Sequence, residues 1–336
     1  MCCPMRRGII SAGNWLSDTI KFIRNYPAVG NLVTIEHIEQ GFGGCAHNVL
    51  ADLAHLKSGI PLYAGGCVGR DALGDEVLAT CERLGINADG ICRTDAATSY
   101  TDVMADMTAG TRTFFHHRGA NALFGAEQAL AIDVEAKIYH LGYLLLLDKM
   151  DEEDAEYGRV AARVLDELQR RGYKTSVDVV SEEGDRFRSI ILPCLRYVDY
   201  FIINEVEAGA CFGESLRDEA GEPVLSKIAA AAEFLLEQGV RDSVIIHFPE
   251  GGYAVRRGEE GVYVPSFRIP ASEIVSSVGA GDAFCATMLY ALHEDMPLAE
   301  GLRMAAAAAW FNLHNATSAD GAPTLEQLQQ FLEEHK

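Results

Sequence analysis

The sequence predicts an α/β fold in which a mostly parallel central sheet lies between two layers of helices and carries a small β-sheet lid. Short apolar runs of strand length alternate with amphipathic segments of helix length along most of the 336 residues. This order is typical of a parallel sheet that helices cover on both faces. Two stretches interrupt the alternation with paired extended segments, which predict the lid. No linker, repeat or low-complexity tract divides the chain, so we expect a single domain over residues 1–336.

The core elements are expected in strand–helix order along the chain. The first half gives a strand at Gly8–Ser11, a helix at Ala46–Lys57, a strand at Leu62–Val68 and a helix at Asp71–Leu84. The second half gives strands at Lys137–Leu141, Lys174–Val179, Tyr200–Ile203 and Ser243–Phe248, helices near Glu152–Arg171 and Leu225–Gln238, and two adjacent helices at Gly279–His293 and Leu298–Asn315.

The lid is expected from two inserted segments, Asp18–Gln40 and Thr98–Gly119. The second reads TSYTDVMADMTAGTRTFFHHRG, with polar and apolar residues alternating on both sides of a turn at Thr108–Gly110. Such alternation indicates a half-exposed sheet that can act as a flap over a site. An open apolar sheet of this kind can also pair with that of a second copy, which predicts a homodimer through the lid.

The charge balance excludes some classes of partner. The net charge is −21, from 49 acidic and 28 basic residues. Such a chain is repelled by nucleic-acid phosphates and by anionic membranes, so we expect neither as a partner. The same field opposes the approach of any phosphate-bearing ligand, and a chain of this composition that binds one therefore needs an anion site built from backbone amides.

Cysteine usage and hydropathy predict a cytoplasmic protein. The nine cysteines form no C-x-x-C pair, which favours reduced thiols in a cytosol. The N-terminus MCCPMRRGIISAGNW lacks the apolar stretch and the cleavage site of a signal peptide. The longest apolar run, around Tyr143–Leu147, is far too short to cross a bilayer.

The segment SSVGAGDAFCATMLYAL, residues 276–292, carries the most chemical information. Gly279, Ala280 and Gly281 precede Asp282 at the start of an apolar helix. Glycines let several backbone N–H groups converge, and a helix N-terminus adds about half a positive charge, so the turn predicts a phosphate site. An acid at this place can act as a base beside a transferred phosphoryl group. The structural alternative is that Asp282 only caps the helix.

This segment resembles D-T-x-G-A-G-D-A-F, the second signature of the ribokinase-like (PfkB) carbohydrate kinases. Residues 41–86, GFGGCAHNVLADLAHLKSGIPLYAGGCVGRDALGDEVLATCERLGI, resemble the first signature of the same family. The two motifs occur in the family's order, and the resemblance covers residues 8–325. A dinucleotide fingerprint at Gly41–Gly44 is the weaker alternative, because G-x-G-x-x-G needs a glycine where the chain has Ala46.

The resemblance implies a ribokinase-like three-layer α/β/α domain and a transfer of the γ-phosphoryl group of ATP to a hydroxyl of a small sugar. Asp282 would be the general base, and Mg²⁺ would be required. A nucleoside kinase of the adenosine type is the nearest alternative. A non-catalytic sugar or nucleotide sensor with the same fold is a second alternative, supported by two departures from the family pattern, Pro249 and Ser276.

The resemblance also implies which residues hold the sugar. Asp18, Gly43, Gly44 and Asn48 would bind its hydroxyl groups, and Asn121 in RGANALF would also reach the substrate. Carboxylate and amide groups form directed hydrogen bonds with hydroxyls, and glycines let a sugar ring approach the backbone. The alternative for Asn48 is a helix-start residue that bonds its own backbone.

Two further segments would hold magnesium and the nucleotide. NEVEA, residues 204–208, resembles the family's N-x-x-E, so Asn204 and Glu207 would position Mg²⁺, largely through water. VIIHFPEGGYAV, residues 244–255, resembles the strand and turn that touch the ATP phosphates, with His247 in place of the usual donor and Gly252 retained. Pro249 replaces the first glycine of this turn and has no N–H to offer.

A monovalent cation site is not expected from the residues present. Ser276 stands where the family has an aspartate that helps to hold the ion. The loop NATSADGAP, residues 315–323, also departs from the family's cation-binding run.

Overall fold

The computed structural model describes residues 6–181, 184, 186–315 and 321–336. In this part of the chain, the central sheet is nine-stranded. From β13 to β5 in the sheet order the strands pair in parallel, and the edge strands β14 and β15 run antiparallel. In sheet order the strands are β15 (Val262–Pro265), β14 (Gly251–Arg256), β13 (Ser243–Phe248), β12 (Tyr200–Asn204), β11 (Lys174–Val179), β8 (Ile138–Leu144), β1 (Ile9–Gly13), β4 (Leu62–Gly69) and β5 (Asn87–Thr94).

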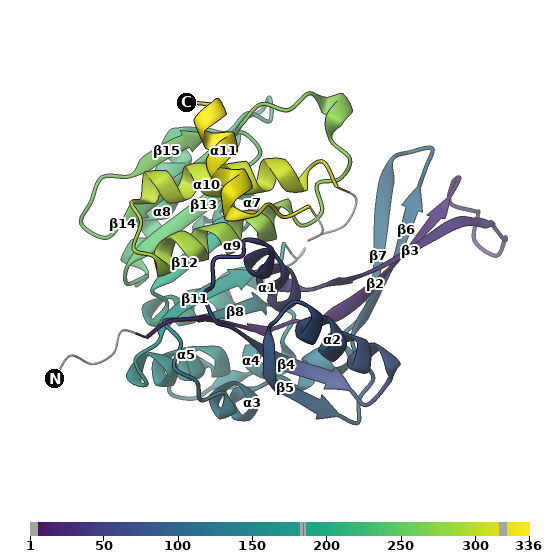
Figure 1. Cartoon of the computed structure of the whole chain (residues 1–336), viewed down its shortest axis with the longest axis horizontal. Helices are drawn as coiled ribbons and strands as arrows, with labels where there is room; N and C mark the ends of the chain where they lie inside the picture. The colour runs from purple at the N-terminus through teal and green to yellow at the C-terminus, as the bar shows by residue number, and fades with distance from the viewer. Residues whose placement is uncertain (1–5, 182–183, 185, 316–320) are drawn as a thin grey trace.

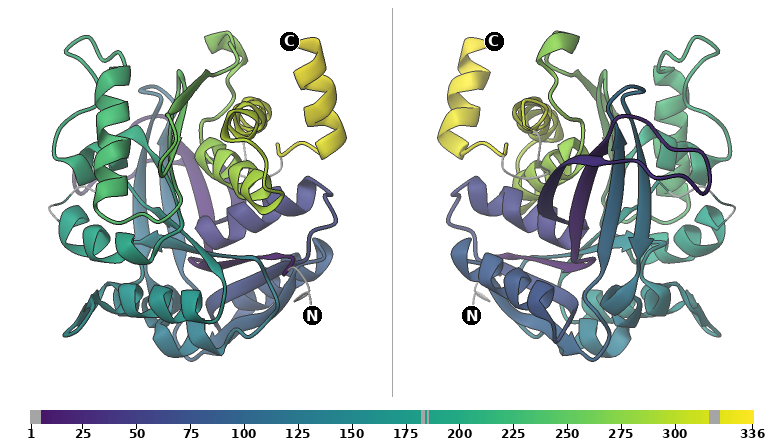
Figure 2. Two further views of the ribbon diagram at one scale, coloured as in Figure 1. Left: turned by 90° about the vertical axis from the view of Figure 1, so that its left-hand side faces the viewer. Right: turned by 90° about the vertical axis from the view of Figure 1, so that its right-hand side faces the viewer.

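Helices cover both faces of this sheet (Figure 2). Because successive strand residues point to opposite faces, Ile9 joins one buried hydrophobic cluster and Ile10 joins the other. The first cluster is covered by α1 (Cys45–His55), α2 (Ala72–Arg83), α9 (Ala280–His293), α10 (Leu298–Asn312) and α11 (Leu325–Glu334). The second is covered by α3 (Ala126–Ala131), α4 (Asp148–Asp151), α5 (Val160–Arg170), α6 (Phe187–Ile191), α7 (Glu205–Phe212) and α8 (Leu225–Glu237). The predicted α/β/α class with a mostly parallel sheet is confirmed.

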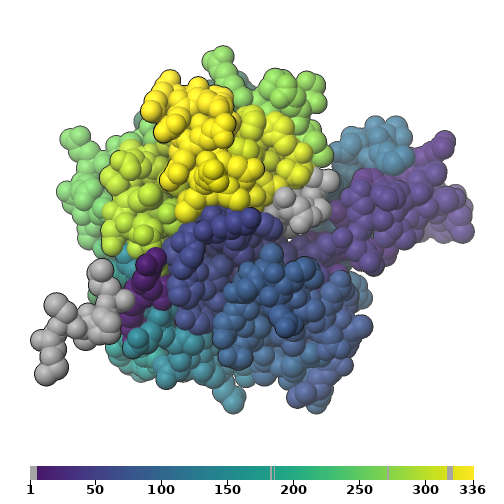
Figure 3. Space-filling model, in the orientation of Figure 1, coloured from purple at the N-terminus to yellow at the C-terminus, as the bar shows by residue number. Residues whose placement is uncertain are grey.

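A second, four-stranded sheet in the described residues has the order β3-β2-β6-β7. It projects from the body of the molecule in Figure 1, and the same projection is visible in Figure 3. β2 runs antiparallel to β3 but parallel to β6, because the chain passes through the core between the two hairpins. Its strands are β2 (Leu16–Ile23), β3 (Ile35–Gly43), β6 (Tyr100–Asp106) and β7 (Thr111–His117).

One expected helix is shorter than the sequence indicated. The sequence predicts a helix near Glu152–Arg171, and α5 begins only at Val160. The residues before it form a small antiparallel pair, β9 (Glu153–Asp154) with β10 (Gly158–Arg159). The side chain of Asp154 accepts hydrogen bonds from the backbone N–H of Glu156 and Tyr157, each 3.0 Å long. This local turn competes with the helix for the same backbone groups.

No helix in the described ranges has both the length and the apolar character needed to cross a membrane.

Candidate active site

Asp282 lies in the first turn of α9 and is almost fully buried. The N-cap residue Gly279 has φ +82°, a left-handed conformation that favours glycine, and it turns the chain into the helix. α9 packs against α1 and α10. The carboxylate and the N–H groups of the GAG turn are therefore presented together at a helix N-terminus, as the sequence predicted.

Both oxygens of the Asp282 carboxylate accept hydrogen bonds from side chains. Asn48 Nδ2 donates to Oδ2 at 2.9 Å, and the Tyr143 hydroxyl donates to Oδ1 at 2.5 Å. Burial raises the pKa of Asp282, while these two donors lower it in part. The structure thus brings Asp282 and Asn48 together, although 234 positions separate them in the sequence.

Tyr143 was not among the residues expected at the site. It stands at the end of β8, where the following leucines made the segment look like ordinary core. The signal that could have identified it is its place at the carboxyl end of a parallel strand, because ligand sites of α/β sheets lie at this edge.

Asp18 lies on β2, opposite Gly41 of β3. A Cβ atom on Gly43 would lie closer than 3.0 Å to Asp18 Oδ2, so the missing side chain at Gly43 is what leaves room for this carboxylate. Burial raises the pKa of Asp18 to about 6, and a hydrogen bond with Thr101 opposes that shift.

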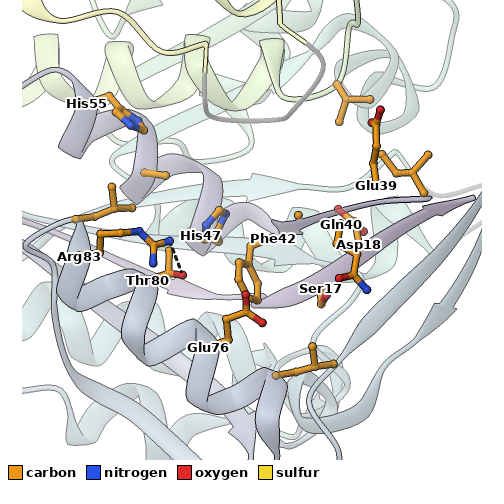
Figure 4. Close-up of a pocket in the computed structure, with 16 residues that line it drawn as sticks. Ser17, Asp18, Glu39, Gln40, Phe42, His47, His55, Glu76, Thr80 and Arg83 are labelled. Atoms are coloured by element: carbon orange, nitrogen blue, oxygen red, sulfur yellow. Dashed lines mark hydrogen bonds between the residues drawn. The ribbon is translucent and has the colours of Figure 1, made fainter. Parts of the chain in front are cut away.

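A cavity of about 390 Å³ opens beside Asp18, between the lid strands β2 and β3 and the helices α1 and α2 (Figure 4). Phe42 and His47 lie along it, and Arg83 lies at the end away from Asp18. Asp282 does not line this cavity. Val278, which directly precedes the Gly279–Gly281 turn, is the residue of this segment that lines the cavity.

Gly44 and Asn121 hold the backbone around the entry to the lid. Gly44 has φ +91°, and a Cβ atom there would lie 2.5 Å from the carbonyl oxygen of Asn14. Asn121 lies in the 3-10 turn η1 (Gly119–Leu123) and is fully buried, and its Oδ1 accepts a hydrogen bond from the N–H of Trp15 at 3.1 Å. Its Nδ2 has no hydrogen-bond partner within the described ranges. In these ranges Asn121 does not line the cavity, and it forms no hydrogen bond with Asp282.

Asn204 and Glu207 form a capping box at the start of α7. The Asn204 side chain accepts from the N–H of Glu207 at 2.9 Å, and Glu207 Oε2 accepts from the N–H of Asn204 at 2.9 Å. Glu207 Oε1 also accepts from Ser181 Oγ at 2.8 Å, and burial raises the Glu207 pKa to about 7. A carboxylate oxygen has two lone pairs, so each still has one for a metal-bound water. The pair fits the predicted water-mediated magnesium site.

A buried polar floor lies beneath Asp282 and was not predicted. Cys45 Sγ lies 3.2 Å from His140 Nε2 and donates to Asp178 Oδ2 at 3.8 Å, while Cys285 Sγ lies 4.0 Å from the same nitrogen. His140 Nδ1 pairs with Ser176 Oγ at 3.0 Å, and burial lowers the pKa of His140 to about 3, so the imidazole is neutral. Thiol, imidazole and carboxyl groups satisfy one another there and are closed to solvent.

The turn between β13 and β14 carries the groups expected near ATP. His247 pairs with Gly252 across this hairpin. Its ring centroid lies 5.0 Å from that of Phe284, and burial lowers its pKa to about 4. Arg217 fixes the turn from outside, since it donates to both oxygens of Glu250 at 2.9 and 3.0 Å and to Glu205 at 2.6 Å.

Ser276 is buried, and its Oγ accepts a hydrogen bond from the N–H of Val278 at 3.2 Å. The loop 315–323 also differs in sequence from the family's cation-binding run. Its residues 316–320 lie outside the described residues.

Comparisons with known proteins agree with this geometry. The model of the pfkB family carbohydrate kinases matches residues 15–325. Deoxyribokinase of Salmonella typhimurium is 23% identical over 95% of this chain and 97% of its own length. Ribokinase of Schizosaccharomyces pombe is 24% identical over 94% of this chain and 95% of its own. The structure of Arabidopsis thaliana ribokinase with ribose and ATP shares the fold, with a TM-score of 0.79 at 22% identity over 98% of this chain and 99% of that one.

Proposed function

The chain belongs to the pfkB family of carbohydrate kinases, and we propose that it transfers the γ-phosphoryl group of ATP to a hydroxyl group of a small sugar. The observation that carries the proposal is the Asp282 carboxylate, which is buried in the first turn of α9 directly after the Gly279–Gly281 turn. A base and a set of convergent N–H groups at one helix N-terminus are the two parts that phosphoryl transfer requires.

In this reaction Asp282 takes the proton of the substrate hydroxyl, and the hydroxyl oxygen forms a bond to the γ-phosphorus. The bond between that phosphorus and the bridging oxygen breaks, and ADP leaves. The N–H groups of residues 279–282 stabilise the negative charge that develops on the transferred group. Asn204 and Glu207 would hold Mg²⁺ through water, and the ion would neutralise phosphate charge. His247 and Gly252 would face the ATP phosphates.

The sugar would lie between the lid and α9. Asp18 would bind its hydroxyls from the lid, and Asn48 would bind them from α1, beside Asp282. Gly43 and Gly44 would let the ring approach. Asn121 is fully buried outside the cavity, so it would support the site through its hydrogen bond with the backbone of Trp15. The names ribokinase and deoxyribokinase among the relatives favour a pentose as the acceptor.

A nucleoside is the second candidate acceptor, and one observation favours it. The cavity beside Asp18 continues between α1 and α2 as far as Arg83. A substituent on the sugar, such as a base, could occupy this extension.

We also propose that two copies pair through their lid sheets. Phe114 and Phe115 of β7 are 62% and 55% exposed, and Ile38 of β3 is 50% exposed. β3 and β7 are the two edge strands of this sheet, and an edge strand with exposed apolar side chains is a site where a second chain can pair. Mass photometry of the purified protein would show the dimer.

The proposed reaction is tested with Asp282→Asn. ADP release is measured over a panel of pentoses, hexoses, sugar acids and nucleosides, and the best substrate is kept for the variant. Loss of a general base should lower turnover by ~10²–10⁴-fold. ATP binding and the melting temperature should stay near those of the parent. Near-parental turnover in a folded variant would show that Asp282 is not the base.

A further inference from the structure

Tyr143 contacts Asp282, the candidate base, but the proposed reaction gives Tyr143 no role. Its hydroxyl donates to Asp282 Oδ1 at 2.5 Å, while Asn48 occupies Oδ2. Tyr143 lies on β8 and Asp282 lies on α9, and 139 positions separate the two residues in the sequence. It is therefore a long-range contact made only in the folded site.

The backbone of Tyr143 is held firmly in place. Its N–H donates to Asn14 Oδ1, and the N–H of Asn14 donates to the carbonyl of Gly142 at 3.0 Å. Gly13 and Gly142 pair directly between β1 and β8, and a Cβ atom on Gly13 would collide with the Gly142 carbonyl. The position of the phenol is consequently set by two central strands of the sheet and not by a loop.

The direction of the hydrogen bond follows from the surroundings of the phenol. Burial and the neighbouring Asp282 charge both raise the pKa of Tyr143, so the phenol keeps its proton and acts as a donor. A donor favours the ionised form of the carboxylate, whereas burial favours the protonated form. A carboxylate oxygen has two lone pairs, so Oδ1 can hold the phenol and still accept the proton of a substrate hydroxyl.

We propose that Tyr143 is a positioning residue that holds the Asp282 carboxylate ionised and oriented toward the substrate hydroxyl. This inference rests on the proposed role of Asp282 as the base. It assigns to the hydroxyl of Tyr143 a function that the aromatic ring alone cannot supply.

Other titratable groups lie near the same carboxylate, and the charge of Asp282 raises the pKa of each of them. They are Asp52 and Cys45 of α1, Asp178 of β11, Glu207 of α7 and Cys285 of α9. Since these groups contribute to the pH dependence of every variant, the measured quantity is the difference between variants.

The test is the pH profile of kcat/KM for Tyr143→Phe, which keeps the ring and removes the donor. Without the donor the carboxylate binds its proton more tightly, so the acid limb should move to higher pH by about one unit, a tenfold change in proton affinity. The KM for ATP should stay unchanged. Tyr139→Phe is the matched control, because Tyr139 is a buried tyrosine of the same strand whose hydroxyl bonds to the carbonyl of Ala129 at 3.3 Å.

An acid limb that stays in place in Tyr143→Phe, or that moves equally in Tyr139→Phe, would overturn the inference. A second variant covers the case in which Tyr143→Phe does not fold. Incorporation of 3-fluorotyrosine at position 143 keeps the shape and strengthens the donor, so the acid limb should move to lower pH; an unchanged limb there would also overturn the inference.

The two proposals fail in different ways. If Asp282→Asn retains activity, the assignment of the base is wrong. If Asp282→Asn is inactive while Tyr143→Phe keeps the parental acid limb, the base is correct and the role of Tyr143 is wrong.

Discussion

Replacement of Gly43 by alanine should weaken sugar binding without unfolding the protein. The added Cβ atom would lie closer than 3.0 Å to Asp18 Oδ2, 3.3 Å from Asp18 Cγ and 3.1 Å from Leu16 Cδ1. The closest atom is the end of a side chain, so the carboxylate can rotate away at a cost of about 0.5–1.5 kcal/mol in rotamer energy. The rotated carboxylate can no longer meet the sugar. A hydrogen bond to a charged group contributes about 1.5–3 kcal/mol, which predicts a loss of roughly ten- to a hundredfold in sugar affinity.

The assay is calorimetric titration of the sugar and of ATP into the same preparation. Gly41→Ala is the control for a methyl group added to the same cavity, because Gly41 also lines the cavity from β3 but an added Cβ atom there meets nothing within 4 Å and leaves Asp18 in place. Sugar affinity should fall much further in Gly43→Ala than in Gly41→Ala, with ATP affinity unchanged in both. Parental sugar affinity in Gly43→Ala, or an equal loss for sugar and ATP, would refute the placement of Asp18 against the sugar.

The remaining predictions concern pH and potassium. Because burial raises the pKa of Asp18 to about 6, its carboxylate is ionised above that pH and loses its charge below it. The KM for the sugar should therefore be constant at higher pH and rise as the pH falls through about 6, and Asp18→Asn should abolish this rise; a flat profile in the parent would contradict it. Since Ser276 offers a neutral hydroxyl where an acid would hold an ion, potassium should raise the rate by less than about threefold in tetramethylammonium buffer, and a steep saturable activation would show that prediction to be wrong.

The sequence predicted the parts of this molecule that depend on local patterns. The alternation of strands and helices follows from hydrophobic periodicity, and the GAG turn before α9 follows from the need for left-handed backbone at Gly279. The assignment of Asp282 as the base and of Asn48 as a sugar-binding residue came from the family resemblance, and their direct hydrogen bond was not predicted.

The features that were missed depend on contacts between distant segments. Tyr143 belongs to an apolar run that reads as core, and only the pairing of β8 with β1 places its hydroxyl on Asp282. The Cys45–His140 contact spans 95 positions and likewise has no signal in either segment alone. The short hairpin before α5 was missed for a local reason, because the bonds of the Asp154 side chain to the following backbone are not visible in helix periodicity.

The bond between Asn48 and Asp282 has a consequence for the order of folding. It joins the first helix of the chain to a helix close to its end, across 234 positions. Contacts of such high sequence separation form late, because a long loop must close before they stabilise the structure. During synthesis, α1 and the lid leave the ribosome well before α9, so a partly made chain holds the sugar-binding residues without the carboxylate. In refolding experiments, catalytic activity should therefore recover after helical structure does, and it reports completion of the whole fold.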